Sequence, residues 1–234
     1  MSTDLLLDLL WLVPTVPAVV LLLRARARVL RSISKYRAIE SRTRLSGSQV
    51  ARVLLDSAGL PHVPIVEIDG DLTDHYDPRR RALKLTTHSL RESSVAAIGI
   101  ATHEVGHAMQ HYSGYRPLRL RTWVVPVALV LPPLGLGLIV IGGVVGKHEL
   151  TWAGTFLFMA AIALAVAVLP VEWDASRRGL ALLKANKLAD PEDVIGIDAV
   201  LDASPLTYLA LLFAAFGQIV VTGLSAAGVS RRAE

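Results

Sequence analysis

The sequence predicts a mainly α-helical, polytopic membrane protein with about four transmembrane helices and a small α+β cytosolic segment that carries an H-E-x-x-H helix. Three observations support this prediction. The chain of 234 residues is 53% hydrophobic, its mean hydropathy is +0.49, and its apolar residues are gathered in blocks. Lys and Arg are gathered between those blocks, and the run "HEVGH" lies in the longest polar segment. We expect residues 1–234 to form one domain.

Four apolar stretches are long enough to cross a bilayer core of about 30 Å, which takes roughly 20 residues. The first contains Pro14 and Pro17, which membrane helices tolerate. It lacks the basic start and cleavage site of a signal peptide, so we interpret it as a retained anchor. The second and third are separated only by "KHEL" and should form a hairpin. The expected transmembrane helices cover residues 5–23, 123–146, 151–169 and 206–224.

The distribution of basic residues predicts the orientation in the membrane. The segment 24–122 holds 17 of the 24 Lys and Arg residues, and the segment 170–205 holds four more. Four spans place both segments on one side, which the positive-inside rule identifies as the cytosol. The net charge of +4 is then explained by topology and by anionic lipid, and we expect no nucleic-acid partner. The absence of cysteine excludes disulfides and thiolate sites, so a metal would need His, Asp or Glu ligands.

The segment 24–122 should contain helices and a small sheet. A basic helix continues from the first span, and "SGSQVARVLLDSAGL" has a helical period that ends at Gly59. The stretch "VPIVEIDGDL" reads as a strand that turns at Asp69–Gly70, and "RRRALKLTT" reads as a second strand. Together they predict a hairpin or a sheet of at most three strands. A long helix should follow, from about Ser93 or Ser94 to Tyr112.

The run "THEVGHAMQH" places His103 and His107 one turn apart on a single helix face. Two imidazoles can then bind one cation, and Glu104 lies where it can take a proton from an activated water. His111 is a further four residues along, but three histidines in this row span about 12 Å, which one tetrahedral zinc would struggle to bridge. Gly106, inside the helix, suggests that another element packs closely against this turn.

A third ligand should come from another part of the chain, where "LPVEWDASRR" begins as the third span leaves the bilayer. Glu172 and Asp174 are candidates, because an acidic residue at the lipid boundary is costly unless it is paired or metal-bound. The alternative is that Glu172 pairs with Arg177 or Arg178 on the next helical turn.

The runs "THEVGHAMQ" and "LPVEWDASRR", separated by a hydrophobic hairpin, resemble the bacterial YugP-like family of neutral zinc membrane metallopeptidases. The stretches "LTDHYDP", "LKLT" and "LTYLA" are similar to that family as well, so the resemblance covers most of the chain. It implies that His103, His107 and Glu172 bind one Zn²⁺ per chain and that Glu104 is the catalytic base. It also implies a multi-pass protein of the bacterial plasma membrane.

More distantly, the arrangement resembles membrane gluzincins of the HtpX type. Those proteins carry an aspartate four residues after the ligand glutamate, whereas this chain has Ser176 there and Asp174 two residues earlier. The resemblance therefore leaves open whether Asp174 or Ser176 orients the histidines from outside the ligand shell.

The stretch "DHYDP" allows two interpretations. Asp74, His75 and Asp77 could bind a metal, or they could form a turn before a strand. If the strand 82–86 is the sheet edge near the site, an extended peptide could pair with it. His75 or Tyr76 could then polarise the scissile carbonyl.

We therefore expect a membrane-bound zinc endopeptidase whose site opens to the cytosol at the membrane surface. Its partners would be a peptide or membrane-protein substrate and the lipid bilayer; its oligomeric state is left open. A catalytically idle zinc-binding scaffold or regulator is the main alternative, although such a protein would not need Glu104. A protease site inside the bilayer is disfavoured by the polar residues of the H-E-x-x-H helix. A transporter is disfavoured because the second half of the chain does not repeat the first.

Overall fold

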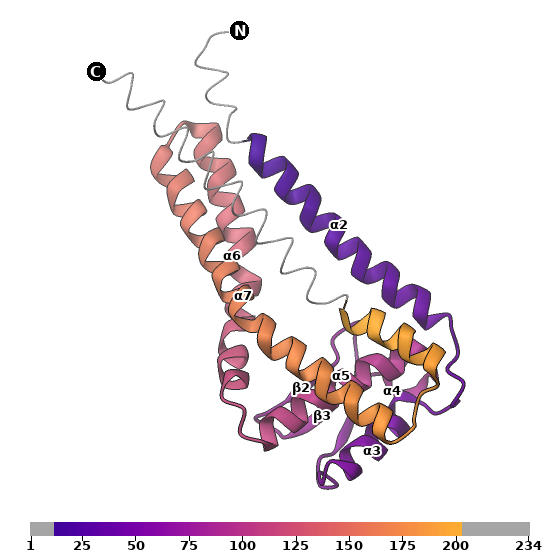
Figure 1. The fold of residues 1–234 in the computed structure, drawn as a ribbon. Coiled ribbons are helices and arrows are strands. Elements are labelled where there is room, and N and C mark those ends of the chain that lie inside the picture. The colour runs from indigo at the N-terminus through magenta and orange to yellow at the C-terminus, as the bar shows by residue number, and fades with distance from the viewer. Residues whose placement is uncertain (1–11, 203–234) are drawn as a thin grey trace. The chain divides into compact units, whose positions relative to one another are not determined.

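The computed structural model describes residues 12–202, so the predicted fourth span 206–224 and the first residues of the predicted first span lie outside the described part (Figure 1). The chain divides into two compact units. One contains residues 12–27 and Leu120–Leu169, and the other contains Arg28–Arg119 and the described residues from Pro170 onward. The fold is mainly helical with one small sheet, as the sequence predicted.

Two long apolar helices, α6 (Pro117–Val145) and α7 (His148–Ala185), form an antiparallel hairpin through their residues 120–145 and 148–169, which belong to the first unit. Both are long and apolar enough to cross a membrane, with mean hydropathies of 2.5 and 2.3. They match the predicted second and third spans. A third helix, α2 (Leu12–Arg37), combines part of the predicted first span with the predicted basic helix, and the crossing of a membrane by α2 stays a prediction.

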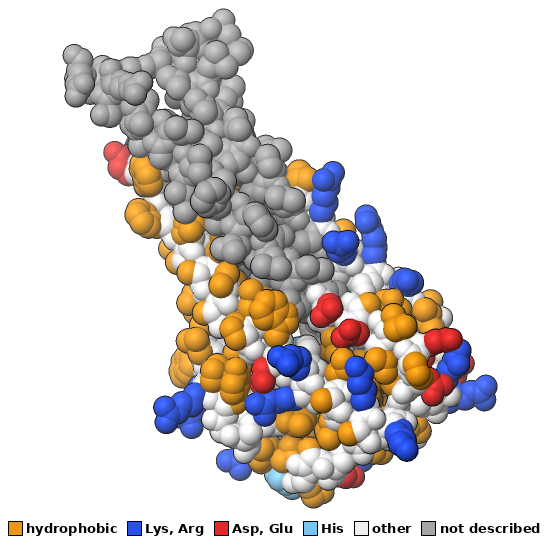
Figure 2. Space-filling view, in the orientation of Figure 1, with side chains coloured by type: hydrophobic (Ala, Val, Ile, Leu, Met, Phe, Trp, Pro, Cys, Tyr) orange, Lys and Arg blue, Asp and Glu red, His pale blue; other side chains and the backbone are white. Residues whose placement is uncertain are grey.

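The hairpin is closed by small residues that let the two helices approach. A Cβ atom on Gly154 would lie 2.5 Å from the Gly135 carbonyl oxygen, so neither position has room for a side chain. Small residues serve this purpose in membrane helix pairs, where close van der Waals packing drives association. Large hydrophobic side chains remain exposed on the hairpin, including Trp123, Val144 and Phe156. Figure 2 shows hydrophobic side chains gathered along it, as expected of a lipid-facing surface.

The second unit surrounds a helix that begins and ends at clear signals. This helix, α5 (Val95–Tyr112), starts where the Ser94 hydroxyl accepts the amide of Ala97. The preceding α3 (Gly47–Ser57) starts with a capping box between Ser46 and Gln49. It ends before Gly59, whose φ of 75° lies in the left-handed region that glycine adopts readily. Both helices confirm the prediction. The short helix α4 (Thr87–Arg91) lies between β3 and α5, and residues 191–202 are also helical.

The sheet has three strands, β1 (Ile65–Ile68), β2 (His75–Asp77) and β3 (Ala82–Thr86), in the order β1-β3-β2. The two predicted strands pair in parallel, so the hairpin alternative for them is wrong. The antiparallel hairpin is instead formed by β2 and β3. The stretch "DHYDP" was interpreted as either a metal site or a turn, and it contributes the strand β2. The strand 82–86 does not meet the condition set for peptide pairing, because β3 is paired on both sides and the edges of the sheet are β1 and β2.

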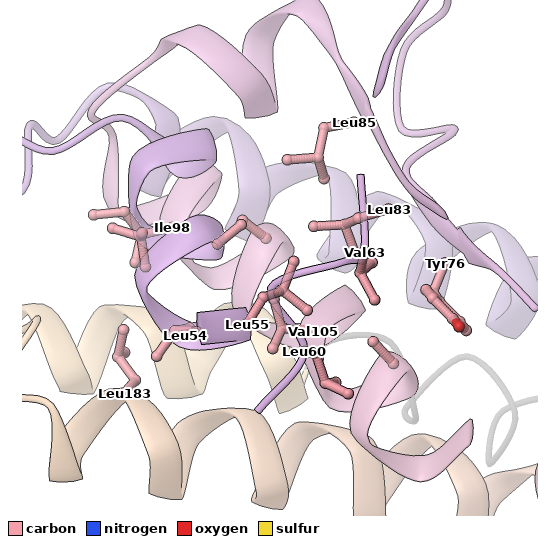
Figure 3. Packing of buried hydrophobic residues seen from close by; sticks show 14 of the residues in the cluster. Leu54, Leu55, Leu60, Val63, Tyr76, Leu83, Leu85, Ile98, Val105 and Leu183 are labelled. Atoms are coloured by element: carbon pink, nitrogen blue, oxygen red, sulfur yellow. The ribbon is translucent and has the colours of Figure 1, made fainter. Parts of the chain in front are cut away.

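The core of this unit lies between α3, α5, β3 and the end of α7. Leu54, Leu83, Ile98, Val105 and Leu183 are fully buried there, and each comes from one of these four elements (Figure 3). Burying an aliphatic side chain of this size contributes about 1.5–3 kcal/mol. Residues distant in sequence therefore hold α5 against both β3 and α7.

Candidate metal centre

Three potential metal ligands converge from two helices. His103 and His107 come from consecutive turns of α5, and Glu172 comes from α7. The Nε2 atoms of His103 and His107 lie 3.1 and 3.6 Å from Oε2 of Glu172. One ligand atom from each residue lies within 4.8 Å of the other two, a separation that a single ion can bridge. His107 and Glu172 are buried, and His103 is half-buried.

Glycine residues bring the two helices into backbone contact at this point. A Cβ atom on Gly106 would lie 2.1 Å from the Ala175 carbonyl oxygen, and one on Gly179 would lie 2.3 Å from the Thr102 carbonyl oxygen. The prediction that another element packs closely at Gly106 is confirmed, and that element is the α7 turn that follows Glu172.

Ser176 contacts the first histidine on its far side from the carboxylate. Its Oγ lies 3.0 Å from Nδ1 of His103. Ser176 stands four residues after Glu172, so its hydroxyl and the Glu172 carboxylate reach the same imidazole from adjacent turns of α7. Which ring nitrogen donates depends on the His103 tautomer: if the Ser176 hydroxyl accepts the Nδ1 proton, Nε2 presents its lone pair to Glu172.

The second histidine is contacted by a residue that sequence reasoning missed. Nδ1 of His107 lies 2.9 Å from Oε1 of Gln110. The Gln110 amide donates both of its protons across to α7, to the Val171 carbonyl at 2.8 Å and to Asp174 at 2.9 Å. Asp174 therefore contacts Gln110, and Gln110 in turn contacts the histidine. Asp174 also accepts a hydrogen bond from the Arg178 guanidinium at 2.6 Å. The available signal was a glutamine three residues after His107, on the same helix face.

This network tests whether the three residues suit a cation. Because both Gln110 amide protons are donated elsewhere, its oxygen faces His107, and Nδ1 of His107 must be the donor. Nε2 is buried and has no hydrogen-bond partner, so it is the ring nitrogen that can offer a lone pair to a metal. A buried lone pair that faces a carboxylate oxygen is unfavourable unless a cation lies between them. Two imidazoles and one carboxylate form the ligand set of catalytic zinc sites, which keep a fourth position open.

Glu104 follows His103 in the chain and does not belong to the group of converging ligands. Its side chain is 5% exposed, and its Oε2 accepts the backbone amide of Tyr76 at 2.8 Å. This bond attaches the edge strand β2 to the middle of α5 and fixes the orientation of the carboxylate.

The remaining predicted site residues lie in other contacts. His111 accepts or donates a hydrogen bond with the Tyr76 hydroxyl at 2.7 Å, and burial together with Arg81 lowers its pKa. Burial raises the pKa of Tyr76. Nδ1 of His75 lies 2.8 Å from the Thr73 carbonyl oxygen.

The acidic residues of "DHYDP" hold the local chain. Asp74 accepts the amide and hydroxyl of Thr86, and Asp77 accepts Lys84 at 2.8 Å. Within residues 12–202, the three-residue group that could hold an ion is that of His103, His107 and Glu172, and neither Asp74 nor Asp77 belongs to it. Arg178, one of the two partners considered for Glu172, pairs with Asp174 one turn before it.

Comparisons with known proteins agree with these features. The family described as "putative neutral zinc metallopeptidase" matches residues 11–225. The "putative membrane protease YugP" of Bacillus subtilis (strain 168) is 36% identical over 206 residues, which cover 86% of this chain and 90% of that protein. No solved structure matches the chain.

Proposed function

Because the chain belongs to this family of putative neutral zinc metallopeptidases, we propose that it is a membrane-bound zinc endopeptidase with His103, His107 and Glu172 as the ligands of one zinc ion. The observation that supports this proposal most directly is the convergence of these three side chains around the buried Nε2 of His107, which has no hydrogen-bond partner. Glu104, next to His103 in the sequence, is not among the converging ligands.

Zinc in such a site supplies a Lewis acid that acidifies a water molecule and polarises the peptide carbonyl. Glu104 is the proposed general base: it takes the proton from the attacking water and passes it to the leaving amine. The Tyr76 amide holds Oε2 of this carboxylate, so we assign the transferred proton to Oε1. Burial of Glu104 keeps competing water away from the transfer.

The substrate is proposed to be a peptide or a membrane protein that binds in an extended conformation along β2. This strand is one edge of the sheet, and its Tyr76 amide donates to Glu104. A peptide that pairs with this edge would place its backbone beside the proposed base. That His75 or Tyr76 polarises the carbonyl stays a prediction. The Tyr76 hydroxyl is hydrogen-bonded to His111, so it would have to exchange this partner for the substrate carbonyl.

The proposed site faces the cytosol at the membrane surface. The Lys and Arg distribution supports this orientation, because the segments 24–122 and 170–205 that carry the site hold most of the basic residues. The apolar α6–α7 hairpin supports attachment to the bilayer.

The variant Glu104→Gln tests the enzymatic role. Glutamine keeps the shape of the side chain and an oxygen for the Tyr76 amide but removes the basicity. Zinc should remain bound, while cleavage of an unstructured reporter chain by the detergent-solubilised protein should fall by about 10²–10⁴-fold. A chelator should abolish the wild-type activity, and His103→Ala should lose both metal and activity.

Two outcomes would favour the scaffold alternative. One is a Glu104→Gln protein that cleaves as fast as wild type, which would assign the cleavage to another source. The other is a wild-type protein that cleaves nothing and whose Glu104→Gln variant retains no additional bound proteins on purification. A protease that has lost only its base should retain its substrates.

A further inference from the structure

Gln110 is fully buried although it is a polar residue on the face of α5 that meets α7. A buried amide costs free energy unless all of its hydrogen-bonding groups are satisfied. Here the oxygen contacts His107, and the two amide protons go to Val171 and Asp174. The side chain is therefore a three-way connection between a proposed zinc ligand on α5 and the α7 turn that carries Glu172.

We infer that Gln110 is a positioning residue that sets the tautomer and ring orientation of His107 and fixes its distance from the Glu172 turn. This inference rests on the proposed metal site. Its physical basis is that the Gln110 amide cannot rotate by 180° without losing its bonds to Val171 and Asp174. The oxygen consequently faces Nδ1, the proton stays on Nδ1, and Nε2 is kept for the metal.

Asp174 and Arg178 support Gln110 from outside. Asp174 accepts both the Gln110 amide and the Arg178 guanidinium on one oxygen, Oδ2, at 2.9 and 2.6 Å. Arg178 also lies over the Tyr115 ring and donates to Ser113, just past the end of α5. The charge of Asp174 is thus balanced by Arg178, and the group that touches His107 is a neutral amide.

Two substitutions at this position separate positioning from packing. Gln110→Met keeps the length of the side chain and removes its polar atoms. Gln110→Glu keeps an oxygen acceptor for Nδ1 of His107 but loses both donors and buries a charge beside Asp174. If Gln110 served only to fill space, Gln110→Met would be the milder change. If it positions His107, Gln110→Glu should bind zinc more tightly than Gln110→Met.

The control is Thr102→Val, on the same helix. The Thr102 hydroxyl is buried without a hydrogen-bond partner, so its removal tests a buried polar-to-apolar change that should leave the metal site intact.

The experiment measures zinc affinity of the full-length proteins in detergent by competition with a chromogenic chelator, and the visible absorption of their Co²⁺ forms. Gln110→Met should lose about 10–100-fold in zinc affinity, the usual effect of removing a partner of a ligand histidine, and its Co²⁺ spectrum should change. Thr102→Val should match wild type in both measurements.

The inference is overturned if Gln110→Met binds zinc as tightly as wild type, or if Gln110→Glu binds it more weakly than Gln110→Met. Should Gln110→Glu fail to fold, the Co²⁺ spectrum of Gln110→Met decides, and an unchanged spectrum overturns the inference. A wild-type protein that binds no zinc would instead contradict the proposed function, so the two failures are distinguishable.

Discussion

Replacing Gly106 with alanine should separate the two helices that carry the proposed ligands. The new Cβ would lie 2.1 Å from the Ala175 carbonyl oxygen, whereas ordinary contact begins near 3.4 Å. Relief of this clash requires α5 and α7 to move apart by about 1.3 Å at a point three residues from Glu172. Metal–ligand distances tolerate changes of only about 0.2 Å. The displacement therefore exceeds what the ligand sphere can absorb.

We expect Gly106→Ala to reduce zinc affinity at least tenfold, the lower end of what disturbed ligand support produces. The substitution also gains about 1 kcal/mol of helix propensity, which offsets part of the about 1–3 kcal/mol that overpacking costs. Stability measured without metal should therefore change little compared with the loss of metal binding. The assay is chelator competition for zinc, combined with thermal unfolding of the metal-free protein.

Gly99→Ala is the matched control, since it lies in the same helix two turns earlier. Its Cβ would meet Val200 at 3.4 Å, an ordinary contact, so zinc affinity should be unchanged and stability should rise by the helix propensity gained. If Gly106→Ala bound zinc as tightly as Gly99→Ala, the claim that backbone contact at Ala175 sets the spacing of the site would be refuted.

Three further predictions concern the third ligand, the sheet and the topology. Glu172→Ala should cost at least tenfold in zinc affinity and Asp174→Ala less, and equal metal content in wild type and Glu172→Ala would contradict the ligand assignment. Burial tends to raise the pKa of Asp77, but its hydrogen bonds to Lys84 and to backbone amides lower this pKa to about 2. The ionised carboxylate therefore stabilises the folded state above about pH 4, and this contribution is lost as the pH falls toward 2. Asp77→Asn should therefore lower the free energy of unfolding by about 1 kcal/mol at pH 7 and by less at pH 3. A difference that does not change with pH would contradict the assignment of this stabilisation to the ionised carboxylate. In this cysteine-free chain, a cysteine at Ser48 should resist an impermeant thiol reagent in intact cells, while one near either terminus should react; the reverse pattern would invert the predicted orientation.

The elements that were predicted correctly are those whose cause is local. The helix α5 is marked by Ser94 at its start and by a helical pattern up to Tyr112, and its period alone places His103 and His107 on one face. In the same way, Ser46 and Gly59 mark the two ends of α3. These features depend on residues a few positions apart, so one sequence contains the necessary information.

The features that were missed depend on contacts between distant residues. β2 is three residues long and contains aspartate and histidine, and it is a strand because it pairs with β3. The parallel pairing of β1 with β3 likewise follows from tertiary packing and not from either strand's pattern. Gln110 shows the same limit: its position on the helix was evident, but its function as a contact with α7 depends on where Val171 and Asp174 lie.

The hydrogen bond from β2 to Glu104 has a consequence for genetics. Its donor is the main-chain amide of residue 76, which every amino acid except proline can supply. A mutational scan that replaces side chains one at a time would leave this hydrogen bond in place. Tolerance of substitutions at position 76 would therefore say nothing about the importance of the bond. The orientation of the proposed base therefore depends on the path of the backbone, and it can be kept during evolution while the side chain at position 76 changes.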